Sequence, residues 1–419
     1  MFAIIRLAAK ELYKKKVCTL LMFFVCLMAM YLVITASTNA FGALCQQREF
    51  ENSIDLDMER ILHLYYDETK ETDEFVKALR GFRQDIEGLS GVKNLGRFDL
   101  TGMYFSELRE SEAYRQVNAG IVKDGKYEAH PDIARLLRAD ESILPLVRGG
   151  ISEYGDGTSG VLPVYVSEVF EEALPVGKIL TDEYTGERYE IAGYFAKGSR
   201  WVEENDLIRF PMVSMDGWFV APFSGESEKD IMIQLSCLHN TYLLLGEDAD
   251  IDRLKAEISK CAEKYGFAAR AEVLAEEYQG YCLETKALTD RQIRLAAFLT
   301  AMAVSAVAAV FTTNALLKRR QYGILMANGW SLGEIILTAG TEISMLVFTS
   351  TALSWTAKLG MLLRSTDLFR EILLLAHIRY TLPAAALAAT GIVCFAALIP
   401  AAKIRGYRPA ALIGGCKWQ

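Results

Sequence analysis

The residues whose types could do chemistry gather in one short polar link, 318–334. The link begins with three cations at 318–320, continues through the apolar run Ile324-Leu325-Met326 and turns at Asn328-Gly329. Cations after an apolar helix are expected from the helix dipole and from the excess of Lys and Arg in cytoplasmic loops. On their own they indicate only a membrane boundary, whereas the apolar run favours a surface on which a partner protein docks.

Catalytic signatures are absent from the sequence. It has no Gly-x-x-x-x-Gly-Lys-Ser/Thr loop for ATP phosphates, no Gly-x-Ser-x-Gly elbow and no His-Glu-x-x-His helix. The four histidines are far apart, and the outward cysteines Cys45, Cys237, Cys261 and Cys282 lack metal-ligand spacing but leave one or two disulfides open. We expect a non-catalytic chain without a metal or cofactor of its own, although a hydrolase with an unfamiliar site stays open.

Four windows of this 419-residue chain are long and apolar enough to cross a hydrocarbon core of about 30 Å as helices. They cover 17–41, 295–317, 335–357 and 380–402, so one span is followed, after a long hydrophilic stretch, by three closely spaced ones. Lys, Arg, Asp and His are absent from these windows, and Glu342 is their only acid. The sequence therefore predicts an α-helical membrane protein with four transmembrane helices in a 1+3 layout.

The cations that flank the spans predict the orientation. They lie in the leading segment 1–16, the link 318–334 and the tail 403–419, which share one side when the spans are threaded alternately. The positive-inside rule makes that side the cytoplasm, so 46–290 and the loop 358–379 face outward. Segment 1–16 has a basic stripe beside an apolar face, which predicts an amphipathic helix on the inner membrane surface. A plain extension of the first span and a cleaved signal peptide are the alternatives.

The outward segment 46–290 is predicted to be a mixed α+β domain of two subdomains. Strand–helix–strand patterns within 46–99 and 240–275 form the first, a β-rich stretch at 100–239 forms the second, and helical residues 276–294 continue as a stalk. The segment holds 27 Lys and Arg against 48 Asp and Glu. This acidity either keeps the domain soluble or attracts a cationic ligand such as a basic peptide, and it disfavours nucleic acid.

Three further patterns point to a family. The link carries a basic cluster followed by Gly-Ile-x-x-Ala-x-Gly, and its residues are Lys318, Arg319, Arg320, Tyr322, Gly323, Ile324, Leu325, Ala327, Asn328 and Gly329. A closing pattern is formed by Pro400, Arg405, Pro409 and Leu412. The outer segment contains Val166-Ser167-Glu168, Leu174-Pro175-Val176-Gly177 and a strand-like 189–195. Together these patterns resemble permeases of the FtsX/MacB type, with a MacB-like periplasmic core domain, although Gln321-Tyr322 departs from the family's usual Glu-containing form.

The resemblance implies a function. A separate cytoplasmic ABC ATPase, which binds ATP and Mg, would dock beneath 318–334, and two permease copies, or this chain and a paralogue, would pair among the lipids of a bacterial plasma membrane. Their mechanical motion would let the outer domain export or dislodge a peptide, lipid-linked or antimicrobial substrate, or meet a cell-envelope ligand. The alternatives are an FtsX-type regulator that activates a cell-wall enzyme or sensor partner, and an outward-facing receptor without an ATPase.

Glu342 stands about two turns inside the third span. It is either an acid that reaches the headgroups or pairs helices there, or a polar contact in the permease dimer or with Asn314, one of the few polar side chains at that depth. Small polar residues follow it along the span, among them Ser350 and Ser354, and they permit close approach of a neighbouring helix.

Overall fold

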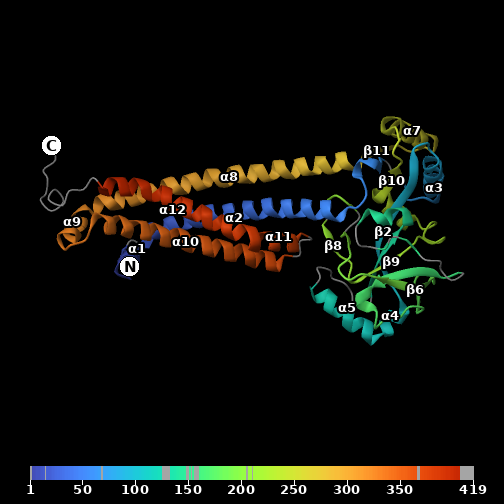
Figure 1. Ribbon diagram of the computed structural model, residues 1–419, viewed down its shortest axis with the longest axis horizontal. Coiled ribbons are helices and arrows are strands. Elements are labelled where there is room, and N and C mark those ends of the chain that lie inside the picture. Colours follow the sequence, from blue (N-terminus) through green and yellow to red (C-terminus); the bar gives the residue numbers. More distant parts are fainter. Residues whose placement is uncertain are drawn as a thin grey trace. The chain divides into compact units, whose positions relative to one another are not determined.

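The computed structural model describes residues 2–14, 16–67, 69–124, 133–147, 151, 153–154, 160–203, 206–209, 211–365 and 369–405. They divide into two units, one made chiefly of long helices and the other of Gln46–Leu283. Figure 1 labels the helices and strands of both units. Each unit is described by itself below.

The helical unit contains four helices that are long and apolar enough to cross a membrane. They are α2 (Lys16–Ser53), α8 (Leu274–Leu317), α10 (Leu332–Arg364) and a final stretch in which α11 (Arg370–Ala376) passes through a π-turn (His377–Thr381) into α12 (Leu382–Arg405). Two shorter helices, α1 (Phe2–Lys14) and α9 (Arg319–Ala327), precede the first span and follow the second. The predicted 1+3 order of apolar helices is therefore present.

The helices extend beyond the windows predicted from hydropathy. Helix α2 runs to Ser53, well past the expected end at 41, because residues 46–53 are polar but contain no Gly or Pro that would end a helix. The expected outer loop 358–379 is also largely helical, since α10 continues to Arg364 and α11 begins at Arg370. Hydropathy marks the part of a helix that suits lipid and says little about where the helix ends.

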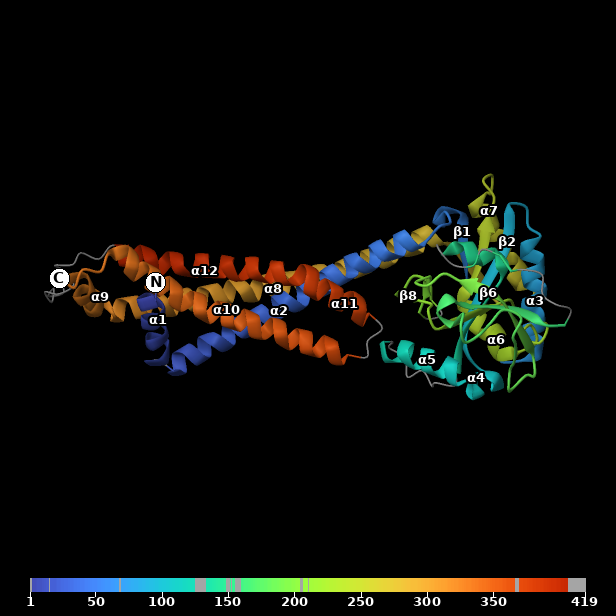
Figure 2. The same ribbon diagram turned by 60° about the horizontal axis from the view of Figure 1, so that its bottom comes forward.

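The interior of the helical unit is apolar. Met30 and Ile34 of α2, Val347 of α10 and Ala389 of α12 are almost fully buried in one cluster. Helices α10 and α12 lie side by side in both views (Figures 1 and 2). The Ser350 and Ser354 hydroxyls of α10 donate to the carbonyl oxygens of Phe23 and Leu27 of α2, at 3.3 and 3.0 Å. Small polar residues of the third span therefore bring the first span into close contact.

The outer unit is built around one sheet. Among its described residues nine strands follow the order β11-β1-β10-β2-β3-β9-β4-β6-β5, and β7 pairs with β8 separately. The strands are β1 (Ile61–Tyr66), β2 (Val92–Tyr104), β3 (Ile133–Ala139), β4 (Leu162–Ser167), β5 (Ile179–Thr181), β6 (Arg188–Phe195), β7 (Arg200–Val202), β8 (Met212–Ser214), β9 (Trp218–Ala221), β10 (Thr241–Leu245) and β11 (Ala269–Val273). The helices are α3 (Asp73–Glu87), α4 (Ser106–Glu110), α5 (Glu112–Asp124), α6 (Ile231–Ser236) and α7 (Ile251–Lys264). The domain is mixed α and β, as the sequence predicts.

The two strand–helix–strand units lie together at one end of this sheet. Their strands form the order β11-β1-β10-β2, and Phe82 of α3 and Ile258 of α7 are fully buried in a shared core. Helix α7 begins at Asp250, whose side chain caps the helix by accepting from the Arg253 amide. Strand β2 pairs with β10 through its first half and with β3 through its second. Because one strand belongs to both parts of the sheet, the division into two subdomains stays a prediction.

Candidate functional site

The link between the second and third spans contains a short helix. Helix α9 starts directly after Lys318 and ends at a Schellman-type turn, in which the Trp330 amide donates to the Leu325 carbonyl at 3.1 Å. Gly329 has a φ of 90°, a left-handed conformation that glycine adopts without strain. Ser331 then forms a capping box with Glu334 and starts α10. Local signals thus fix both ends of the link.

Helix α9 has one face against the bundle and one face exposed. Tyr322 and Gly323 are buried, and Tyr322 packs in a cluster with Ile335 of α10 and Ile404 of α12. On the opposite face Ile324 is 51% exposed, and the side chains of Arg320, Ala327 and Asn328, three or four residues from it, are also exposed. Arg319 is exposed at the first position of the helix. Leu325 is half-buried. Helix α9 therefore exposes two cations and an apolar side chain, while Tyr322 packs it against the bundle.

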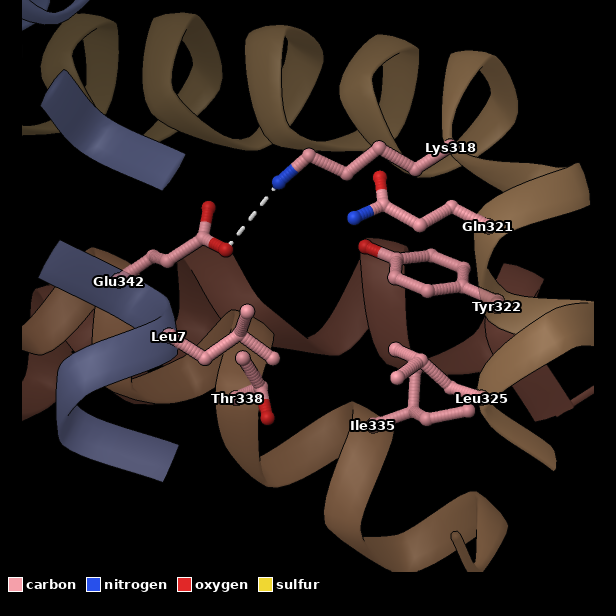
Figure 3. A pocket seen from close by; sticks show the side chains of 8 residues that line it. All are labelled: Leu7, Lys318, Gln321, Tyr322, Leu325, Ile335, Thr338 and Glu342. Carbon is pink, nitrogen blue, oxygen red and sulfur yellow. Dashed lines mark hydrogen bonds and ion pairs between the residues drawn. The ribbon is translucent and has the colours of Figure 1, made fainter. Parts of the chain in front are cut away.

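A buried ion pair joins the start of α9 to α10. The Lys318 ammonium donates to the Glu342 carboxylate at 3.2 Å, and the two side chains are only 9% and 6% exposed. Figure 3 shows the pair beside Tyr322 and Thr338, with Leu7 of α1 on the near side. A charge that is withdrawn from water is tolerated only when it is paired, so this contact ties the start of α9 to α10.

Glu342 was predicted at a helix contact, but Lys318 was not predicted as its partner. Asn314, the partner that was considered, lines a small cavity together with Glu342 and Lys318. The signal for Lys318 was nevertheless present, because it is the first cation after the second span and Glu342 is the only acid within the spans. A hairpin of two helices brings such positions to similar depths.

The C-terminal family motif is described only in part. Pro400 is buried within α12, and Arg405 is the last residue of that helix. Ile404, next to Arg405, is fully buried in the cluster that holds Tyr322. Pro409 and Leu412 lie outside the described residues. The described half of the motif thus lies in the last turns of α12, whose Ile404 packs in one cluster with Tyr322 of α9.

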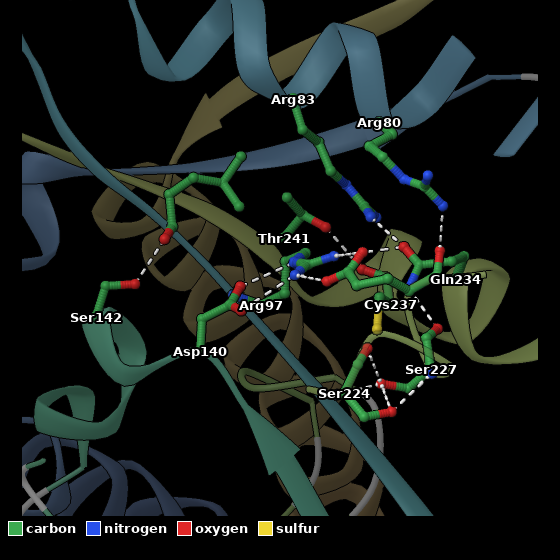
Figure 4. A network of polar contacts seen from close by, with 12 residues as sticks. Arg80, Arg83, Arg97, Asp140, Ser142, Ser224, Ser227, Gln234, Cys237 and Thr241 are labelled. Atoms are coloured by element: carbon green, nitrogen blue, oxygen red, sulfur yellow. Dashed lines mark hydrogen bonds and ion pairs between the residues drawn. The ribbon is translucent and has the colours of Figure 1, made fainter. Parts of the chain in front are cut away.

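In the outer unit a network of arginines forms a second polar centre that sequence reasoning did not find (Figure 4). Arg97 of β2 donates to Asp140 at 2.8 Å and to Glu228 at 2.6 Å, and it is 7% exposed. Burial acts to raise the pKa of Glu228, but the hydrogen bond and charge of Arg97 outweigh it and the pKa is lowered. Arg80 donates to the Glu228 carbonyl at 2.6 Å, and Arg83 contacts Gln234. The network joins β2 to α3 and to the segment before α6, which is a structural role.

Metal ligands and thiols are further side chains in the described part of the chain that could do chemistry. No group of three or more His, Cys, Asp or Glu residues among these residues could hold a metal ion. The outward cysteines Cys45, Cys237, Cys261 and Cys282 are not joined by disulfides here.

Comparisons with known proteins give structural neighbours only. No protein-family model matches the chain, and no curated protein matches it significantly. The extracellular domain of the noncanonic ABC-type transporter YknZ from Gram-positive bacteria is similar with a TM-score of 0.31 and 14% identity, over 51% of this chain and 99% of that one. The periplasmic region of MacB from Actinobacillus actinomycetemcomitans is similar with a TM-score of 0.31 and 7% identity, over 53% and 92%. The neighbours therefore include MacB, which the sequence motifs also resemble.

Proposed function

We propose that this chain is the permease subunit of an ABC-type transporter and that it transmits the work of a separate ATPase to its outer domain. Helix α9 carries the proposal. Its exposed face combines Arg320 with the apolar Ile324, Arg319 is exposed at its first position, and the opposite face is anchored through Tyr322 and the Lys318–Glu342 pair. An exposed apolar side chain flanked by cations on an anchored helix suits a docking surface for another protein.

The long helix that precedes α9 suits a transmitting role. Helix α8 is continuous over 44 residues from Leu274 to Leu317, which corresponds to about 66 Å at 1.5 Å per residue. ATP and Mg are bound by the partner ATPase, whose closure displaces α9 and, through it, α8. The termini lie in the cytoplasm and the Gln46–Leu283 unit outside, and a second permease copy or a paralogue completes the complex.

The charge of the outer unit supports a choice of substrate class. Residues 46–290 hold 48 acidic against 27 basic side chains, which creates a field that attracts cations. We therefore propose that a cationic peptide, antimicrobial or cell-envelope-derived, is exported or dislodged there. Binding of such a peptide should weaken as salt is raised from 0.05 to 0.5 M, roughly as the Debye length shortens. Binding that does not depend on salt would remove electrostatics from the choice of substrate.

Co-purification tests the docking surface. The full-length chain, extracted in mild detergent, should retain an ATPase, and Ile324→Asp should weaken this association about 30-fold, the effect of losing a central interface contact of about 2 kcal/mol. Leu288→Asp is the matched control, because Leu288 is also exposed, at 64%, but lies on α8. Equal retention of the ATPase by both variants, or its absence from the unmodified complex, would contradict the proposal and favour a receptor that works without an ATPase.

A further inference from the structure

A wide, open groove lies on the surface of the helical unit beside α1. It has a volume of about 440 Å³, within the range of about 300–1,000 Å³ that is usual for ligand sites. Its walls come from three helices: Ala9, Leu12 and Tyr13 of α1, Lys16, Thr19, Leu20 and Phe23 of α2, and Met345, Leu346 and Thr349 of α10. The groove, called the Lys16 groove below, is thus apolar along most of its length.

The corner between α1 and α2 builds the groove. The Thr19 hydroxyl donates to the Leu12 carbonyl at 3.0 Å, which fixes the angle at which α1 leaves α2, and α1 packs against α10. The groove therefore has formed walls on three sides. Leu20 in its lining is 56% exposed, and the neighbouring Leu21 of α2 is 63% exposed. Side chains of this kind on a candidate membrane span face hydrocarbon.

One charged group stands at the groove. Lys16 is the first residue of α2, and its ammonium lies 4.4 Å from the centre of the Tyr13 ring, which holds it by a cation–π contact. The start of a membrane span is at the depth of lipid headgroups, and α1 adds exposed Arg6 and Lys10 on the same side of the spans. An apolar channel with a cation at headgroup depth complements a molecule that has a hydrocarbon chain and an anionic end.

We propose that the Lys16 groove binds one anionic phospholipid from the leaflet on the α1 side, with its phosphate beside Lys16 and an acyl chain along Leu12, Phe23 and Leu346. A second copy of this chain would also cover apolar side chains, but an apolar helix gives Lys16 no anion. The charge at headgroup depth therefore decides between the two occupants. The bound lipid fills the space between α1, α2 and α10 and holds the leading helix at the membrane surface.

Photo-crosslinking tests the proposal. The full-length protein is placed in nanodiscs that contain phosphatidylglycerol with a photoreactive group in its acyl chain, and the crosslinked peptides are mapped. Crosslinks should fall on α1, α2 and α10 around the groove and should exceed those of a phosphatidylcholine probe about fivefold, the effect of roughly one Lys near an anionic headgroup. Equal crosslinking of the two lipids, or crosslinks spread evenly over all spans, would overturn the proposal.

Two pairs of variants separate the site from general surface charge and from folding. Lys16→Gln should abolish the preference for phosphatidylglycerol, while Lys10→Gln, an exposed lysine of α1 outside the groove, should leave most of it. Thr349→Phe should block the groove, while Thr356→Phe, exposed on the same helix two turns further on, should not. Equal loss in both members of either pair would contradict a built site.

The same variants test the competing occupant. Thermal unfolding is measured for each variant, and Thr349→Phe is compared with the unmodified chain by size-exclusion chromatography. If Thr349→Phe dissociates an oligomer and leaves the lipid crosslinks unchanged, a second copy covers the groove and the lipid proposal is wrong. Lost crosslinks with an unchanged oligomeric state and an unchanged Tm support it.

Discussion

Neutralising Glu342 tests whether the buried ion pair holds the start of α9 in place. The Lys318 and Glu342 side chains are 9% and 6% exposed and their charges are 3.2 Å apart. At an effective dielectric constant of about 20 the Coulomb attraction alone is about 5 kcal/mol, before the cost of desolvation. Removing one partner leaves the other charge buried and unpaired, so Glu342→Gln should cost about 3–5 kcal/mol. This corresponds to a fall in Tm of at least about 6 °C.

The double variant separates the pair from two independent losses. Lys318→Met alone should also destabilise, because Glu342 then stays charged in an apolar surrounding. Lys318→Met combined with Glu342→Gln removes both charges. The loss of unfolding free energy in this double variant should therefore be smaller, by at least about 2 kcal/mol, than the sum of the losses in the two single variants. Arg320→Gln, an exposed neighbour, is the control and should stay within about 0.5 kcal/mol. Strictly additive single effects, measured by thermal unfolding in detergent, would refute the reasoning.

Three further changes have outcomes that follow from local structure. Gly329→Ala places a Cβ on a residue with a φ of 90° and should lower the stability of the turn after α9 by about 1–2 kcal/mol, seen as faster amide exchange there. The pKa of Glu228 is lowered in the folded state, so its contact with Arg97 stabilises the fold at pH values above the unfolded pKa of about 4.3. This stabilisation is lost as the pH falls through the pKa of the folded state. In Glu228→Gln the Tm should therefore fall less steeply with acid than in the unmodified chain. Asp250→Ala removes the cap of α7 and should cost about 1 kcal/mol in chemical unfolding, whereas Asp248→Ala, outside that cap, should have little effect.

The sequence specified the helices of the helical unit better than their ends. Apolar windows of about 20 residues are a strong signal, because few other structures need them. The continuation of α2 to Ser53 gave no such signal, since residues 46–53 are as polar as a loop and differ from one only in lacking Gly and Pro. Helix α9 was likewise hidden, because nine residues are too few to show a helical period beside the turn at Asn328-Gly329.

Contacts between distant residues were harder to predict than elements. The Gly-Ile-x-x-Ala-x-Gly motif indicated the link 318–334, and Glu342, the only acid in the apolar windows, indicated a helix contact. The pairing of Lys318 with Glu342 could not be predicted, because it depends on how α8 and α10 are rotated about their axes. In the outer unit the two strand–helix–strand patterns were visible from their periodicity. That β2 continues into the second part of the sheet was not, because strand pairing depends on residues far apart in the chain.

Polar contacts at several depths constrain how the helical unit can move. Towards α9 the Lys318–Glu342 pair joins the start of α9 to α10, and in the middle the Ser350 hydroxyl donates to a carbonyl of α2. Towards the other end Thr38 of α2 lies 3.0 Å from the imidazole Nδ1 of His377, in the π-turn before α12. Each such bond contributes only about 0.6 kcal/mol within a membrane, but a sliding helix would have to break several at once. A displacement of α9 should therefore tilt these helices as one body, and it should not draw one helix past another.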